Sequence, residues 1–104
     1  MAVTCTGGWD RITEEIPKDP MKEIDQAFDN VEHTLQKAGG KGWEQVYKVE
    51  CYVDPLDSKV LEHLVHNLKK YCPNHEPLFN LFGVAALGIP GMHVEIVVAA
   101  HLGK

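Results

Sequence analysis

The segment VEIVVAAHL, from Val94 to Leu102, constrains the fold more than any other part of the chain. Nearly every position in this predicted strand is apolar. A strand with one face in water should alternate apolar and polar residues, whereas continuous apolarity indicates that both faces are buried. Glu95 interrupts the run, and a carboxylate in such a place must be hydrogen-bonded, paired or protonated. The strand and its acid therefore both require a structural explanation.

The rest of the chain alternates between strand and helix patterns. One helix is expected to begin at Pro20 with Asp19 as its N-cap, and to end at the Gly39-Gly40 pair. A second helix is expected to follow a cap at Asp57 or Ser58. The expected strands are residues 3–6, the alternating stretch 43–53, Pro77–Leu87 and Val94–Leu102.

This order of elements predicts an α+β fold, with two helices on one face of a mixed sheet, in a single domain spanning residues 1–104. Two helices can cover only one face of the sheet. The other face of the apolar closing strands must then find a partner, and the simplest partner is another copy of the chain. The pattern therefore predicts an obligate oligomer.

Charge and composition argue against several functions. The formal net charge is −5, and the one basic cluster, Lys69-Lys70, is short, which argues against a nucleic-acid partner. No apolar run is long enough to span a membrane, and the N-terminus does not resemble a signal peptide. We therefore expect no membrane partner and a cytoplasmic location, although a mitochondrial one stays open despite the lack of a visible transit peptide.

No metal site is expected from the cysteines or the histidines. The 3 cysteines have no CxxC spacing and are interpreted as packed thiols. His63 and His66 have helical i, i+3 spacing, but a third ligand is not evident, so we interpret them as solvated surface residues. His93 comes directly before the last strand, where it could reach the mouth of a cleft.

The chain resembles the Rid/YjgF family, also called the reactive intermediate deaminase or L-PSP family. The stretch AFDNVEHTLQKAGGKGWEQVYKVECYV is similar to the helix, loop and strand at the core of that family, and PLFNLFGVAALGIPGMHVEIVVAA is similar to its closing strands. TCTGGWDRITEEIP resembles its first hairpin. The resemblance implies a chorismate-mutase-like fold, a homotrimer with ligand clefts between subunits, hydrolysis of enamines or imines such as 2-aminoacrylate, and no cofactor.

The resemblance also implies roles for particular residues. Glu95 falls on the glutamate thought to position or activate the attacking water, so it is the expected catalytic residue. Thr6 and Gly7 fall on the Ser-Gly pair that lines the cleft. Phe79 occupies the place of the arginine that holds the substrate carboxylate, and Asn80 stands beside it. Phenylalanine cannot replace the bidentate grip of a guanidinium.

Two further features bear on the cleft. Trp9 is either a packing residue or a cleft wall, and Arg11, the only arginine in the chain, would reach a cleft only if its loop folded over it. Family members usually carry about twenty more residues before the first hairpin, so one cleft wall is expected to be incomplete. Two functions stay open: an imine or enamine deaminase with altered specificity, and a small-molecule-binding or protein-interaction module without catalysis.

Overall fold

The computed structural model describes residues 2–101, which form a single sheet with helices packed on it. Within these residues the order of the elements along the chain is strand, helix, short 3-10 helix, strand, helix, strand, strand. Their bounds are β1 Ala2–Gly7, α1 Pro20–Lys37, η1 Gly42–Gln45, β2 Val46–Val53, α2 Ser58–Tyr71, β3 Leu78–Gly83 and β4 Val94–Ala100. The predicted α+β class and the mixed sheet with two helices are confirmed.

The sheet places the last strand in its interior. The strand order is β1-β4-β2-β3, in which β4 is antiparallel to both β1 and β2, and β3 is parallel to β2. The two closing strands are therefore not neighbours, because β2 lies between β4 and β3. β4 therefore has a paired strand on each of its two edges.

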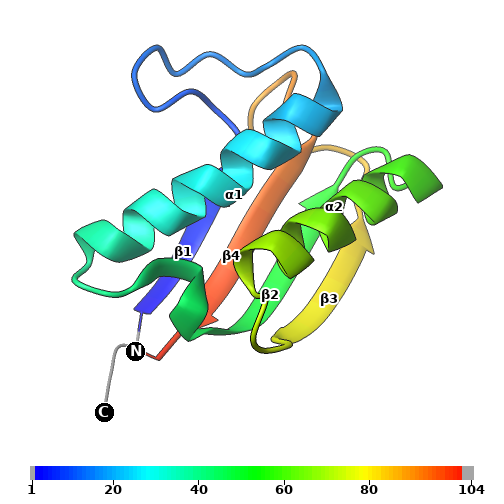
Figure 1. The fold of residues 1–104 in the computed structure, drawn as a ribbon. Helices are drawn as coiled ribbons and strands as arrows, with labels where there is room; N and C mark the ends of the chain where they lie inside the picture. Colours follow the sequence, from blue (N-terminus) through cyan, green and yellow to red (C-terminus); the bar gives the residue numbers. More distant parts are fainter. Residues whose placement is uncertain (1, 102–104) are drawn as a thin grey trace.

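Both helices lie on the same side of the sheet, with α1 packed over β1 and β4. Figure 1 shows α2 running over β2 and β3 on that side, next to α1. The core between the helices and the sheet contains a stack of Phe28 on Trp43, whose ring centroids are 4.9 Å apart. The Trp43 indole N–H donates to the Phe28 carbonyl at 2.9 Å, so the buried ring has a partner for its polar atom.

The helix starts follow from their caps. Asp19 accepts a hydrogen bond from the Met21 amide at 3.0 Å, and Pro20 occupies the first turn of α1. The cap of α2 is Asp57, whose carboxylate accepts from the Val60 amide at 2.9 Å. The structure thus decides between the two cap candidates in favour of Asp57.

Two predicted strand boundaries are wrong. The stretch before Val46 forms η1, because the Trp43 amide donates to the Glu32 carboxylate at 2.8 Å and the indole is drawn into the core. β3 ends at Gly83 and does not reach Leu87, since its partner β2 ends at Val53 and leaves no strand to pair with. The predicted end of the last strand, Leu102, lies outside the described residues.

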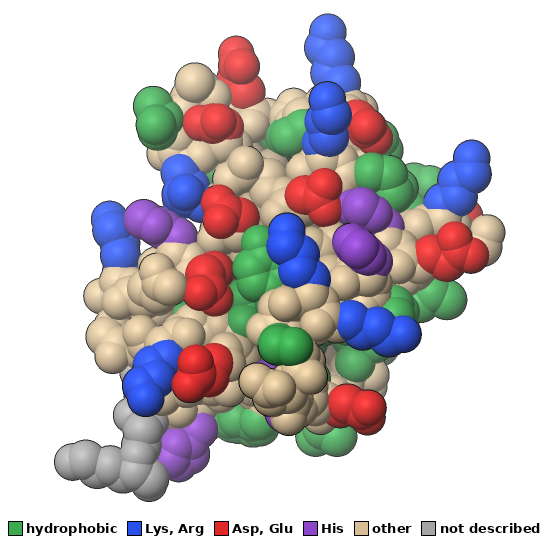
Figure 2. Space-filling model, in the orientation of Figure 1, with side chains coloured by type: hydrophobic (Ala, Val, Ile, Leu, Met, Phe, Trp, Pro, Cys, Tyr) green, Lys and Arg blue, Asp and Glu red, His purple; other side chains and the backbone are tan. Residues whose placement is uncertain are grey.

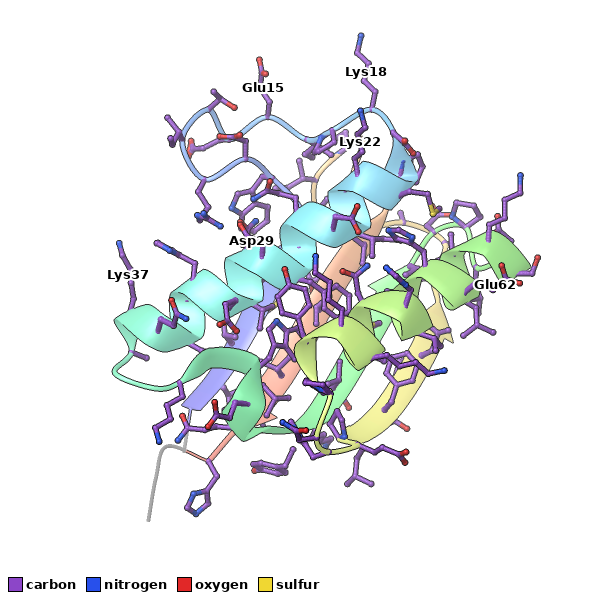
Figure 3. The ribbon with its side chains drawn as sticks, in the orientation of Figure 1. Glu15, Lys18, Lys22, Asp29, Lys37 and Glu62 are labelled. Atoms are coloured by element: carbon purple, nitrogen blue, oxygen red, sulfur yellow. The ribbon has the colours of Figure 1, made fainter. Side chains whose placement is uncertain are left out.

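The side that carries the helices is polar. Figure 2 shows acidic, basic and histidine side chains intermingled over it, and Figure 3 shows Lys22, Asp29 and Lys37 extending from α1. The helix-bearing side thus has the character of a solvated surface.

No helix within the described part of the chain is long and apolar enough to cross a membrane.

Candidate functional site

The sheet face opposite the helices carries a mixture of apolar and acidic side chains. We call it the open face. Strand alternation and the pairing register place on it every second residue of each strand. Its members are Val3, Cys5 and Gly7 of β1, Lys48, Glu50 and Tyr52 of β2, Leu78, Asn80 and Phe82 of β3, and Glu95, Val97 and Ala99 of β4.

Large apolar side chains on this face stand in contact with solvent. Val3 is 64% exposed, Leu78 is 68% exposed and Phe82 is 44% exposed. The opposite face of the central strand is fully packed, since Val94 and Ile96 are both 0% exposed. In the single chain, β4 is therefore covered on one face only. No element among the described residues packs on its other face.

Glu95 lies near one end of the open face, between β1 and β2. Its cross-strand neighbours are Gly7 on β1 and Tyr52 on β2. The Cys5 thiol is its diagonal neighbour. Partial burial, together with a hydrogen bond to Glu95 and the charge of that carboxylate, raises the pKa of Cys5. The thiol is thus held in its neutral form, as a donor to Glu95 and not as a thiolate nucleophile.

An aromatic pair adjoins Glu95. The rings of Tyr52 and Phe82 stack with centroids 5.2 Å apart. Desolvation, followed by the charge of Glu50 and a hydrogen bond to it, raises the pKa of Tyr52. The phenol therefore keeps its proton near neutral pH. Glu95 thus has one neutral donor, the Cys5 thiol, beside an aromatic surface, while the Tyr52 phenol bonds to Glu50.

Gly7 makes room for an aromatic side chain next to Glu95. A Cβ atom at Gly7 would lie 2.5 Å from the Trp9 ring and 2.6 Å from the Met92 methyl carbon. Asn30 of α1 fixes the backbone on both sides of this point, since its amide donates to the Gly7 carbonyl at 3.0 Å and to the Trp9 carbonyl at 2.7 Å. Trp9 is thus held against the residue that pairs with Glu95.

Two of the predicted site residues point the other way. Thr6 is 5% exposed and pairs with Ile96 on the helix-facing side, where its hydroxyl lies 3.1 Å from that of Thr4. Phe79 packs against the hydrophobic core. Neither side chain shares the open face with Glu95 in the single chain, because adjacent strand residues face opposite sides of the sheet. Their roles in a cleft between subunits stay predictions.

Asn80 lies on the open face, between Leu78 and Phe82 of the same strand. It is exposed and pairs with Glu50 of β2, one strand away from β4. The structure thus brings Gly7, Trp9 and Glu95 together. Asn80 lies on the same face, but the strand register does not pair it with any of these three residues.

The remaining polar candidates lie elsewhere. Arg11 bonds to Asp29 and Asn30 of α1, so its guanidinium is held away from the open face. His63 lies between the two helices, with its Nε2 atom 2.6 Å from the Asp25 carboxylate. His93 bonds to buried Glu23 through its Nδ1 atom at 2.7 Å.

Metal ligands do not gather within residues 2–101. No group of three or more His, Cys, Asp or Glu side chains there could hold a metal ion.

Two hollows flank this region. A groove of about 240 Å³ at the other end of the open face is lined by Tyr47, Lys48, Glu50, Val3, Val97, Val98 and Ala99. A cavity of about 350 Å³ lies between the loop that follows β1 and the loop that precedes β4, and is lined by Trp9, Glu14, Ile16 and Ile89.

Sequence reasoning missed Tyr52 and Glu50 as neighbours of Glu95, and Phe82 as the ring that stacks on Tyr52. The alternation of Lys48, Glu50 and Tyr52 with apolar residues was visible, but it only indicates which residues share one face of one strand. Their proximity to Glu95 depends on the cross-strand register, and local patterning does not specify that β4 lies between β1 and β2.

The model of one protein family matches this chain over residues 1–102, and the description of that family is Endoribonuclease L-PSP. No curated protein matches the chain. Among solved structures, the putative endoribonuclease L-PSP from Entamoeba histolytica is 26% identical, with a TM-score of 0.79 over 94% of this chain and 77% of that one.

Two further solved structures show the fold alone, since their identities are lower. The Rid-family protein YyfB from Yersinia pestis has a TM-score of 0.83 at 21% identity, covering 94% of this chain and 74% of that one. RidA from an Antarctic Psychrobacter has a TM-score of 0.80 at 24% identity, covering 91% of this chain and 74% of that one.

Proposed function

Because the chain belongs to the Endoribonuclease L-PSP family, which is also the Rid/YjgF family, we propose that it forms a homotrimer whose open faces pack against one another. Clefts between the subunits would then hydrolyse small imines or enamines. The observation that carries this proposal is the position of Glu95 on a helix-free sheet face, beside Cys5, Tyr52 and Gly7.

The apolar side chains of the open face support the assembly. Val3, Leu78 and Phe82 are exposed in the single chain, and covering a large apolar side chain gains about 1.5–3 kcal/mol. A second copy brings the same apolar strips and keeps the polar helix-bearing side in water. Glu95 would then lie in a partly desolvated seam instead of open solvent.

The proposed reaction needs one carboxylate and one water. Glu95 takes a proton from the water as its oxygen attacks the C=N carbon, and the resulting carbinolamine nitrogen accepts a proton. Collapse of this intermediate transfers the hydroxyl proton to the nitrogen by way of the carboxylate, breaks the C–N bond, releases ammonia and leaves the carbonyl compound. An enamine is first protonated at carbon to give the imine. The carboxylate serves as general base and then as general acid, with no net change.

A second candidate is a binding module without catalysis. Arg11 is the only arginine in the sequence, and it is held by Asp29 and Asn30 of α1. The open face therefore lacks the planar guanidinium that would grip a carboxylate in bidentate fashion. Simple 2-imino acids would bind weakly, which favours either another imine class or no turnover.

Ribonuclease activity has less support, although the family description names it. Among the described residues the open face carries Glu50 and Glu95 against a single cation, Lys48. A phosphodiester would be repelled by the two carboxylates, and in-line cleavage would lack a cationic group to stabilise the developing charge.

Carbonyl release from an imine without a carboxylate, with and without the protein, tests the enzyme proposal, and keto-acid release from 2-iminobutanoate generated in situ is measured beside it. Turnover of the carboxylate-free imine is expected in the wild type, with slower turnover of 2-iminobutanoate, and Glu95→Gln should lose about 100-fold or more, as for removal of a general base. Glu50→Gln is the matched control, since it removes a carboxylate from the same face but not from the catalytic position. The mass of each variant in solution shows whether the assembly is intact.

If the intact assembly gives no acceleration, the standard deaminase role is excluded and the binding module is favoured. A wild-type protein that is a folded monomer in dilute solution contradicts the assembly itself.

A further inference from the structure

The cavity beside Trp9 has the size and lining of a small-molecule site. Its volume of about 350 Å³ lies within the range of about 300–1,000 Å³ typical of ligand pockets. Trp9, Ile16 and Ile89 provide an aromatic and aliphatic wall, and Glu14 provides the single ionisable group. An apolar wall with one carboxylate favours a ligand that has an apolar body and a positive charge.

The loop that holds Glu14 is fixed by its own hydrogen bonds. The Glu14 amide donates to the Asp10 carbonyl at 2.8 Å, and the Asp10 amide donates to the Glu15 carbonyl at 2.8 Å. The Asp10 carboxylate also accepts from the Ile12 amide at 2.8 Å and from the Thr13 amide at 2.9 Å. Glu14 has a φ of 64°, a conformation uncommon outside glycine. Its backbone is thus positioned by the turn before any ligand arrives.

Trp9 connects this cavity to Glu95. Its ring packs on Gly7, which is the cross-strand partner of Glu95, and the same residue lines the cavity. A ligand that contacts Trp9 in the cavity therefore lies beside the end of the sheet that carries Glu95. An indole ring is also the best aromatic partner for a cation.

Two carboxylates lie close to this cavity. Glu14 lines it and Glu95 lies on the adjoining face, while the sole arginine of the chain is engaged on α1 and Lys18 lies in the neighbouring hollow beyond Ile16. Carboxylates near a site attract cations and repel anions.

From these observations we propose that the cavity formed by Trp9, Glu14, Ile16 and Ile89 binds an organic cation with an apolar body, an amine or iminium. The same site would select against carboxylate-bearing ligands. That this cation is the substrate of Glu95 rests on the proposed function, whereas the binding preference is independent of it. The substrate class would then be iminium ions of apolar amines, not 2-imino acids.

Two probes of matched shape test this preference in the full-length protein: 3-phenylpropylamine, a cation at neutral pH, and 3-phenylpropionate, an anion. NMR titration that follows the indole N–H of Trp9 measures both affinities. The amine is expected to bind at least about tenfold more tightly, and Glu14→Gln should weaken amine binding about fivefold, as for loss of an exposed ion pair. Trp9→Phe lacks this indole signal, so its affinity is measured by calorimetry; it should keep part of the amine affinity, as a smaller aromatic surface.

Glu15→Gln is the matched control, because it removes the same charge from the next residue, and Figure 3 shows Glu15 extending away from the body of the protein. The proposal is overturned if the carboxylate binds as tightly as the amine, if neither probe shifts the Trp9 signal, or if Glu15→Gln weakens the amine as much as Glu14→Gln. Amine binding without imine turnover would separate the two proposals, leaving the cation site intact and removing the enzyme.

Discussion

The Glu23 carboxylate of α1 is joined to His93, at the start of the segment that leads into β4, by two hydrogen bonds of 2.7 Å. One comes from the His93 backbone amide and the other from its ring Nδ1 atom. A third, from the Val94 amide, is 3.2 Å long. Glu23 is 0% exposed. A carboxylate can only accept, so this contact places the proton of the imidazole on Nδ1. The pair ties the first helix to the strand that carries Glu95.

Replacing Glu23 should therefore be costly. Glu23→Ala leaves the amides of His93 and Val94 buried without an acceptor, and we expect a loss of about 3 kcal/mol in the free energy of unfolding. Glu23→Gln keeps one acceptor oxygen and should lose less. Urea unfolding followed by circular dichroism measures both. An equal loss in the two variants would show that packing, and not hydrogen bonding, is the source of the stability.

The two neighbouring β3 positions should respond in opposite ways to an arginine. Phe79→Arg places a charge against the core, so we expect a loss of about 3 kcal/mol or a failure to fold. Asn80→Arg projects from the exposed open face and should change the stability of the single chain by about 0.5 kcal/mol or less. Thermal unfolding of the pair tests the strand register directly. If Phe79→Arg is the better tolerated variant, the faces of β3 are assigned wrongly.

Gly8 separates the end of β1 from α1. A Cβ atom there would lie 2.1 Å from the Glu23 carbonyl oxygen, which is backbone and cannot rotate away. Gly8→Ala should therefore destabilise the protein by about 1–3 kcal/mol, as overpacking does. Gly88→Ala is the control, since nothing lies within 4 Å of a Cβ atom at that glycine. Chemical denaturation of the two variants should separate them clearly, and a neutral Gly8→Ala would contradict this packing.

The loop after β1 should depend on the ionised Asp10 carboxylate. Hydrogen bonds from the Thr13 and Ile12 amides lower the pKa of Asp10 below its usual 3.8. Because the folded-state pKa is the lower one, the contribution to stability is fully present above about pH 4 and is lost as the pH falls through the folded-state pKa. NMR titration of the Ile12 and Thr13 amides should show this transition. Asp10→Asn should remove this transition, and a midpoint above pH 3.8 would contradict a lowered pKa for Asp10.

The three thiols should differ in reactivity. Burial raises the pKa of Cys51 to about 12, and burial with the charge of Glu32 raises the pKa of Cys72 to about 11. Neither should react with iodoacetamide at pH 8 until the protein unfolds, because the thiolate is the nucleophile. Cys5 lies on the open face, so it should be labelled faster on dilution if other copies cover that face. Mass spectrometry of the modified peptides identifies each site, and native labelling of Cys51 would refute the packing.

The sequence by itself determined the elements and the class of fold. The caps at Asp19 and Asp57, the helical stripes and the alternation in β2 are local patterns, and each depends on residues a few positions apart. The apolar run of β4 predicted that both of its faces are buried; the helices cover one face, and the cover of the other face stays a prediction. The η1 segment was missed because it depends on the contact of Trp43 with Phe28, two residues that are 15 positions apart in the sequence.

Only the tertiary structure decided which side chains meet. The sequence showed that an acidic residue, Glu95, interrupts the last strand. Its neighbours Cys5 and Tyr52 come from strands that are far apart in the sequence, so the sequence did not indicate them. The same holds for the side of the sheet that Phe79 faces: the structure packs it against the core, and a shift of one residue in a strand reverses the face of every side chain. Periodicity within a strand shows which of its side chains share a face, whereas the register between strands is set by the packing of the whole sheet.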